Sequence, residues 1–149
     1  MDFIQQKSEI SKHESSDCIF CKIIKGKIPC NKVYEDDKVL AFLDIAPNAK
    51  GHTLVVPKTH TENLLDTPTK TLSAILFVAK KLGRPVMNAS GCTGFNFTQN
   101  NFKSAGQDVF HIHFHIIPRV EGDNLKNWPH TSYDDGEAKE MAAKISQNL

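Results

Sequence analysis

The sequence predicts an α+β fold in which helices pack on an antiparallel sheet. Five segments have the pattern of strands and three have that of helices, and most links between consecutive strands are short. Short links of this kind favour an antiparallel sheet with helices packed on it. The chain has 149 residues, 40% of them hydrophobic, which is enough for one domain with a real core.

The first part of the chain is expected to form a short helix and three strands. Ser16 and Asp17 are suited to cap a helix over residues 18–25. Short apolar runs bounded by turn residues then predict strands over residues 31–35, 39–43 and 52–56. We expect Pro57 to end the third strand.

The middle of the chain predicts one long amphipathic helix. Pro68 is suited to the first helical position. From there to about Met87 apolar residues recur at helical spacing, and they are Leu72, Ile75, Leu76, Ala79 and Leu82. Phe77 and Val78 widen this apolar face, so the helix is expected to be well buried. Pro85 is expected to kink the helix or to end it early.

The last part of the chain predicts two more strands and a terminal helix. The strands are expected over residues 95–99 and 110–118, with a polar loop over residues 100–107 between them. Residues 122–135 have no periodic pattern, and residues 136–147 predict the helix.

Composition and charge exclude several classes of protein. The net charge is +1 with neutral histidines, which gives no electrostatic case for a membrane partner and argues against nucleic acid as a partner. No run of about 18 apolar residues is present, so no transmembrane helix is expected. Residues 1–16 are polar and lack the apolar run of a signal peptide. We therefore expect a flexible leader on a cytoplasmic protein.

Three histidines alternate with apolar residues near the end of the chain. His111, His113 and His115 are separated by Ile112 and Phe114. Because side chains in a strand alternate between faces, the three imidazoles are expected on one face, about 6–7 Å apart. Such a row can supply a nucleophile, a proton carrier or a metal ligand. The row itself leaves three interpretations open: a structural role, a metal site and catalysis.

The four cysteines are expected to be free or to bind metal, since a reducing compartment disfavours structural disulfides. Cys18 and Cys21 form a Cys-x-x-Cys pair, which fits a redox pair, two buried thiols or half of a tetrahedral zinc site. A redox pair would need a βαβ context that the sequence lacks. Cys30 and Cys92 are expected to be small buried hydrophobes. Spacing does not choose the histidines that would complete a zinc site; the candidates are His52, His60, His111, His113 and His115.

The loop before the histidine row is rich in small and amide residues. It runs from Asn100 to Asp108, and Gly106 would allow a ligand to approach its backbone closely. Amides and backbone N–H groups of such a loop can bind phosphate, although most loops of this composition are simple turns.

These features together resemble the histidine triad (HIT) family. His111-Ile-His-Phe-His-Ile-Ile117 is similar to its His-φ-His-φ-His-φ-φ motif, where φ is apolar. Further similar blocks begin at Cys18, Val39, Gly51 and Gly106, in the family's order, and the match is closest to the zinc-containing Hint-like branch. The resemblance implies a HIT-like fold over residues 17–122, a tail over residues 123–149 and a homodimer.

The resemblance also implies site residues and a reaction. His113 would attack the α-phosphorus of a purine nucleoside monophosphate conjugate and form a covalent nucleotidyl-histidine, which water would then hydrolyse. His115 would hold the phosphate and help to protonate the leaving group, and His52 would support the site through hydrogen bonds. Asp44 would accept hydrogen bonds from the ribose hydroxyls. The remaining nucleotide-binding positions would be Phe20, Ile23, Phe42 and Ile45 around the base, and Asn100, Gly106 and Val109 near the phosphate. A structural zinc ion would be bound by Cys18, Cys21, His60 and His111.

Asp108 departs from the family pattern. It stands where Hint-like enzymes often have Ser or Thr beside the phosphate, and a carboxylate accepts hydrogen bonds but cannot donate one. The leading hypothesis is a hydrolase of nucleoside 5'-phosphoramidates, in which adenosine monophosphate is linked to an amine. The alternatives are a dinucleoside polyphosphate hydrolase and a non-catalytic nucleotide-sensing or partner-binding module.

Overall fold

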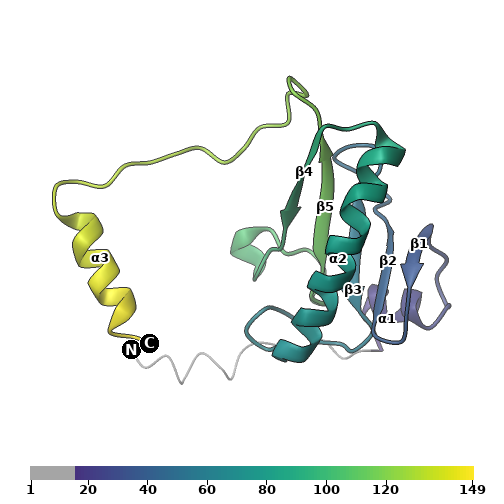
Figure 1. The fold of residues 1–149 in the computed structure, drawn as a ribbon. Helices are drawn as coiled ribbons and strands as arrows, with labels where there is room; N and C mark the ends of the chain where they lie inside the picture. Colours follow the sequence, from purple (N-terminus) through teal and green to yellow (C-terminus); the bar gives the residue numbers. More distant parts are fainter. Residues whose placement is uncertain (1–15) are drawn as a thin grey trace.

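The structure, a computed structural model, describes residues 16–149 (Figure 1). The leader expected over residues 1–16 lies outside the described residues except for Ser16. The elements, in chain order, are α1 (Ile19–Ile24), β1 (Lys32–Glu35), β2 (Val39–Leu43), β3 (Thr53–Pro57), α2 (Thr69–Ser90), β4 (Gly94–Thr98), the 3-10 turn η2 (Lys103–Ala105), β5 (Phe114–Arg119) and α3 (Glu137–Ser146).

The five strands form one sheet in the order β1-β2-β3-β5-β4, and every neighbouring pair is antiparallel. The α+β class predicted from the short strand connections is therefore confirmed. Insertion of β5 between β3 and β4 gives the strand that carries His115 an interior place in the sheet. Residues on β5 are thus held from both sides by main-chain hydrogen bonds.

Alternation along the strands divides the core between the two faces of the sheet. Val39, Ala41 and Val55 pack in the cluster that includes α2. Residues one position along, such as Leu40 and Leu54, pack with Phe20 and the two cysteines of α1 instead. This is the period of two that a pleated strand imposes. The sheet is therefore covered on one face by α2 and on the other by α1 (Figure 1).

Helix α2 begins at Thr69, with Pro68 as its N-cap residue, and continues through Pro85 to Ser90. The expected early end is wrong. Pro85 has no N–H, so the carbonyl of Lys81, one turn earlier, has no hydrogen-bond partner within the helix. Both residues lie on the exposed side of α2, where water can bind that carbonyl.

The apolar face of α2 is narrower than its sequence suggests. Leu76 and Phe77 are 52% and 69% exposed, whereas Ile75, Val78 and Ala79 are buried. A helix lying on a sheet buries only a stripe of its surface, and Leu76 and Phe77 fall outside that stripe. The expectation that Phe77 widens the buried face is therefore wrong.

Helix α1 is capped differently from the prediction. Its N-cap residue is Cys18, whose sulfur accepts a hydrogen bond from the backbone N–H of Cys21, 3.4 Å away. Ser16 and Asp17 lie before the cap, in a turn.

Strand β5 is shorter than the segment predicted over residues 110–118. Its ladder with β3 runs only as far as Phe114, opposite Val55, so His111 and His113 precede the strand. Pro57 has no N–H with which to extend the ladder, and its carbonyl accepts a hydrogen bond from the His111 ring instead. Ile112 N–H donates to the carbonyl of Thr61. The alternation survives nevertheless, because Ile112 and Phe114 pack toward α2.

Beyond β5 the chain leaves the sheet as an extended segment that leads to α3, and Figure 1 shows α3 apart from the rest of the fold. Helix α3 has no buried residue. Among residues 16–149, none of the helices combines the length and the apolar character needed to cross a membrane.

Candidate active site and metal centre

A cleft of about 570 Å³ opens beside β5 and is lined by α1, the ends of β2 and β4, and the loops that follow them. All twelve residues expected to act in catalysis or nucleotide binding line this one cleft. They are Phe20, Ile23, Phe42, Asp44, Ile45, His52, Asn100, Gly106, Asp108, Val109, His113 and His115.

The backbone around His113 fixes which of its nitrogens carries the proton. Nδ1 lies 2.7 Å from the carbonyl oxygen of His111, and because a carbonyl can only accept, Nδ1–H is the donor. In the neutral ring Nε2 then has a free lone pair. Burial lowers the pKa of His113 below its usual value, so the ring stays neutral at pH 7. His113 is 9% exposed and lies at the floor of the cleft, with its ring edge-on to Phe20.

His52 and His115 form a chain with a fixed direction. The backbone N–H of Asn48 donates to Nδ1 of His52 (3.1 Å), so the proton of neutral His52 is on Nε2. That Nε2–H donates to Nδ1 of His115, 2.8 Å away, which leaves the His115 proton on its own Nε2. Burial lowers the pKa of His115 to about 4 and also lowers that of His52.

The two rings of the triad that line the cleft therefore differ in the state of Nε2, which is unprotonated in one and protonated in the other. The ring centroids of His113 and His115 are 4.9 Å apart. Nε2 of His113 is a lone-pair donor, whereas Nε2–H of His115 is a hydrogen-bond donor. A nitrogen that could act as a nucleophile and an N–H that could bind phosphate or donate a proton thus lie side by side.

Asp44 follows β2 and lies beside the rings of His52 and His115, with the ligand atoms of all three residues within 4.8 Å of one another. One carboxylate oxygen accepts from the N–H of Ala46 (2.9 Å), and the other lies 3.7 Å from Nε2 of His52. Phe20 and Phe42 pack edge to face nearby, with ring centroids 5.6 Å apart. Ile45 is 93% exposed and stands at the rim of the cleft.

Gln107 organises the loop before the triad, a role that no sequence pattern indicated. Its side chain is buried, accepts from the N–H of Phe102 (2.8 Å) and donates to the carbonyls of Glu62 and Val109. Gly106 takes the left-handed conformation at φ 85°. The loop is therefore a rigid structure that presents Asp108 to the cleft.

The cleft also contains residues that the sequence analysis missed. Ile117 and Arg119 continue the β5 face of His115, and the period of two was a signal that could have found them. Arg119 forms a two-bond ion pair with Asp123 (2.6 and 2.8 Å) and donates to the carbonyl of Leu125, which holds the start of the tail against the cleft. The tail residues that line the cleft are Leu125, Lys126, Asn127 and Trp128.

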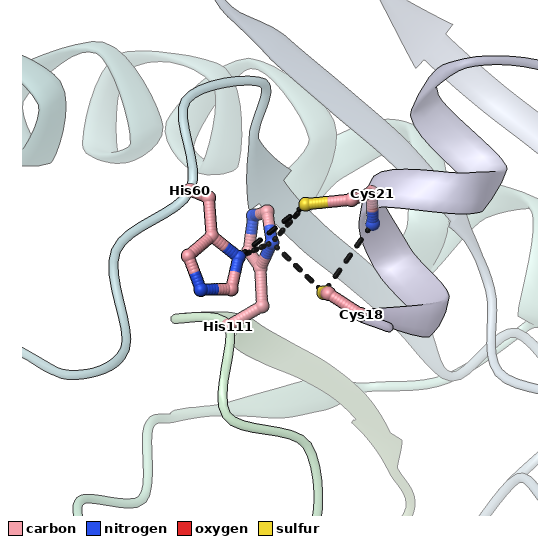
Figure 2. A group of neighbouring side chains, drawn as sticks. All are labelled: Cys18, Cys21, His60 and His111. Atoms are coloured by element: carbon pink, nitrogen blue, oxygen red, sulfur yellow. Dashed lines mark hydrogen bonds between the residues drawn. The ribbon is translucent and has the colours of Figure 1, made fainter. Parts of the chain in front are cut away.

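A second cluster lies at the other side of Phe20. Figure 2 shows Cys18 and Cys21 of α1 facing His60, in the loop after β3, and His111, just before β5. Their ligand atoms all lie within 4.8 Å of one another. Three of the four sulfur-to-nitrogen distances are 3.3–3.5 Å, and the two Nδ1 atoms are 3.1 Å apart. A tetrahedral zinc ion at usual bond lengths separates S and N ligands by about 3.5 Å, so the four residues could hold a metal ion.

The hydrogen bonds around this cluster suit metal binding. His111 donates Nε2–H to the carbonyl of Pro57 (2.8 Å), which leaves the lone pair of Nδ1 directed at the two sulfurs. Burial raises the pKa of the Cys21 thiol to about 11, with Cys18 adding to the effect. Uptake of a cation would therefore release protons from the thiols.

Comparison with known proteins decides the family. A model of the HIT domain matches residues 25–122. The chain belongs to the HIT family. A protein named adenosine 5'-monophosphoramidase from Schizosaccharomyces pombe is 42% identical over 134 residues, or 89% of this chain and 98% of the relative. One named adenylylsulfatase from Arabidopsis thaliana is 39% identical over 140 residues, covering 90% of this chain and 70% of the relative.

Solved structures support the same family and fold. A HIT family protein from Bacillus subtilis superposes with a TM-score of 0.81 at 42% identity, covering 89% of this chain and 97% of that one. A zinc-bound histidine triad family protein from Mycobacterium smegmatis has a TM-score of 0.72 at 36% identity, covering 91% and 99%. HIT family membership, with homologues named as hydrolases of nucleotide conjugates, supports a nucleotide hydrolase.

Proposed function

We propose that this HIT protein hydrolyses nucleoside 5'-phosphoramidates, in which adenosine monophosphate is linked to an amine through nitrogen. The observation that carries the proposal is the pair of opposed tautomers at the cleft floor, an unprotonated Nε2 on His113 beside a protonated Nε2 on His115. The name of the Schizosaccharomyces pombe relative points to the same substrate class.

The reaction divides into two displacements at phosphorus. Nε2 of His113 attacks the α-phosphorus, and the bond from phosphorus to the leaving nitrogen breaks. An anionic substrate raises the proton affinity of the neighbouring imidazoles, so the group formed by Asp44, His52 and His115 takes up one proton as substrate binds. His115 passes a proton from Nε2 to the departing amine. Water then attacks the nucleotidyl-histidine, returns a proton to His115 and releases the nucleoside monophosphate.

The other cleft residues would bind the nucleotide. Asp44 has an oxygen that can accept from the ribose hydroxyls. The apolar side chains of Phe20, Ile23, Phe42 and Ile45 would enclose the base, with Ile45 closing it from the rim. Asn100, Gly106 and the N–H of Val109 would approach the phosphate.

Zinc at Cys18, Cys21, His60 and His111 would be structural, because four protein ligands leave no open position. The zinc-bound relative from Mycobacterium smegmatis supports zinc as the metal.

We also infer a cytoplasmic homodimer. The exposed apolar side chains of Leu76 and Phe77 on α2 support an interface between two copies of the chain. Sedimentation equilibrium should give the mass of two chains, and the mass of a single chain would contradict the homodimer.

The test of the proposed activity is turnover of a lysine-linked adenylate by the purified protein. Wild type should release adenosine monophosphate, and His113→Ala should lose about 10⁴-fold or more in kcat, since a nucleophile cannot be replaced by its neighbours. Rapid quenching should trap nucleotide on wild type through an acid-labile bond. Undiminished turnover by His113→Ala would overturn the mechanism. Faster cleavage of diadenosine triphosphate would favour a polyphosphate hydrolase, and nucleotide binding without turnover a sensing module.

A further inference from the structure

The carboxylate of Asp108 stands at the rim of the catalytic cleft without a partner. Its side chain is exposed, and it lines both the cleft and a smaller adjoining cavity of about 190 Å³. Among residues 16–149, no hydrogen bond or salt bridge reaches this carboxylate, and its charge acts on the ring of His113. The rigid loop fixed by buried Gln107 holds it in place. Its charge is therefore directed at whatever passes the rim.

A second negative charge lies near that of Asp108. The smaller cavity is also bordered by Asp17, so two carboxylates face the same space beside α1. The cations of the cleft lie elsewhere. Arg119 is paired with Asp123. It follows His115 by four residues along β5, and at the usual rise of a strand the backbones of these two residues are about 13 Å apart. Lys126 follows Leu125, whose carbonyl is bound to Arg119, and so belongs to that same end.

The proposed reaction places the leaving group near this rim. His113 lies at the floor of the cleft, and an in-line displacement puts the leaving group on the side of phosphorus away from the attacking nitrogen. The leaving group thus points outward from the floor, toward the rim where Asp108 is exposed. A carboxylate there attracts a cationic leaving group and repels sulfate, phosphate or a carboxylate.

We propose that Asp108 is a specificity-determining residue that selects leaving groups carrying a positive charge and disfavours anionic ones. The inference rests on the proposed phosphoramidate hydrolysis and narrows it to conjugates of cationic amines. A Ser or Thr at this position, by contrast, would supply a hydroxyl without a charge. The negative charge is what distinguishes the two arrangements.

The test uses three substrates that share adenosine monophosphate and the reacting nitrogen. The amines are diaminobutane, which keeps a free ammonium, butylamine, which is neutral, and 4-aminobutyrate, which is anionic. Wild type should follow that order in kcat/KM. In Asp108→Asn the ratio of cationic to anionic substrate should fall about tenfold, as expected for one charge acting over several ångströms near a surface. The efficiencies for the cationic and anionic substrates are each expressed relative to that for the neutral substrate, so that a general effect of the substitution on the cleft cancels.

Controls separate a charge effect from a structural one. Asp37→Asn, in the exposed β1–β2 turn, removes the same charge far from the cleft and should leave the ratio unchanged. Asp108→Ser should behave as Asp108→Asn does. The wild-type preference should also shrink as salt rises from about 0.05 M to 0.5 M, because salt screens exposed charges.

The outcomes are distinct. If wild type cleaves all three substrates with equal efficiency, or if Asp108→Asn keeps the wild-type ratio, the inference about Asp108 is overturned while the hydrolase stands. If wild type cleaves no phosphoramidate, the proposed function fails and the inference fails with it.

Discussion

The protons of the active-site imidazoles are placed by backbone groups. The carbonyl of His111 fixes the proton of His113, and the N–H of Asn48 fixes that of His52 and, through it, that of His115. A neutral imidazole has one proton, so a single obligate donor or acceptor at one nitrogen determines the other. The loop between β2 and β3 thus controls a ring on β5.

We propose that His52 positions His115, and its replacement should separate orientation from binding. His52→Leu removes the donor to His115 and should lower kcat about ten- to a hundredfold with little change in KM, since the ring of His115 loses its fixed tautomer. Steady-state kinetics with the lysine-linked adenylate measures both constants.

The conservative variant provides the check on that expectation. Gln at position 52 keeps an N–H that can reach His115, so His52→Gln should recover part of kcat. Equal losses in the Leu and Gln variants would mean that His52 acts only by packing.

Among the elements, α1 is too short to hold its own position. Its six residues are fewer than the 12–15 or so that an isolated helix needs, so its place depends on what it contacts. Cys18 and Cys21 face the two histidines on one side, and Phe20 packs against His113 on the other. The candidate metal cluster and the side of the cleft proposed to bind the base therefore depend on the same helix.

Loss of the two thiols should therefore weaken both stability and nucleotide binding. Purified protein should contain about one zinc per chain, and the Cys18→Ser, Cys21→Ser double variant should contain none. We expect the Tm of this variant to fall by about 10 °C, which corresponds to a loss of about 3 kcal/mol in the free energy of unfolding for a chain of this size. We also expect KM to rise by a larger factor than kcat falls. Metal analysis, thermal unfolding and kinetics test the three parts.

Cys92→Ser is the matched control for that experiment. Cys92 lies outside the cluster, at the end of α2, so this variant should keep both zinc and Tm. Wild-type protein that is purified without chelators and contains no zinc would refute the metal assignment.

In the molecule as a whole, buried neutral histidines connect the stability of the fold to pH. The folded state lowers the pKa of His52 and lowers that of His115 to about 4, whereas an unfolded histidine titrates near 6.5. Between about pH 6.5 and pH 4 the unfolded chain therefore binds protons that the folded chain does not. The stabilising contribution is complete above pH 6.5 and is lost as pH falls toward 4.

Urea unfolding between pH 7 and pH 4.5 should show this loss as a falling midpoint. The His52→Gln, His115→Gln double variant should show a shallower fall, because two of the titrating groups are gone while the metal cluster is unchanged. Parallel curves for wild type and the double variant would contradict the assignment of the effect to these rings.

Most of the elements and the chemical groups could be predicted from the amino-acid sequence. Short apolar runs predicted β2 and β3, period-two alternation placed Ile112 and Phe114 in the core, and helical spacing found α2, since these patterns depend on burial that a local window records. The triad and the paired cysteines left several roles open, and the resemblance to the HIT family is what assigned a role to each residue. Leu76, Phe77 and the length of β5 were misjudged, because the width of a buried face and the end of a ladder depend on partners elsewhere in the chain.

Which histidine ring lies in which site, and which ring nitrogen carries the proton, depend on the three-dimensional fold alone. The ring of His111 lies with the thiols and those of His113 and His115 line the cleft, with Phe20 of α1 in contact with both His111 and His113. Gln107 donates to the carbonyl of Glu62, 45 residues away, and the His52–His115 link spans 63 residues, so no local pattern encodes these contacts. The physical reason is that tautomers, ligand geometry and the surroundings of Asp108 arise where distant segments meet.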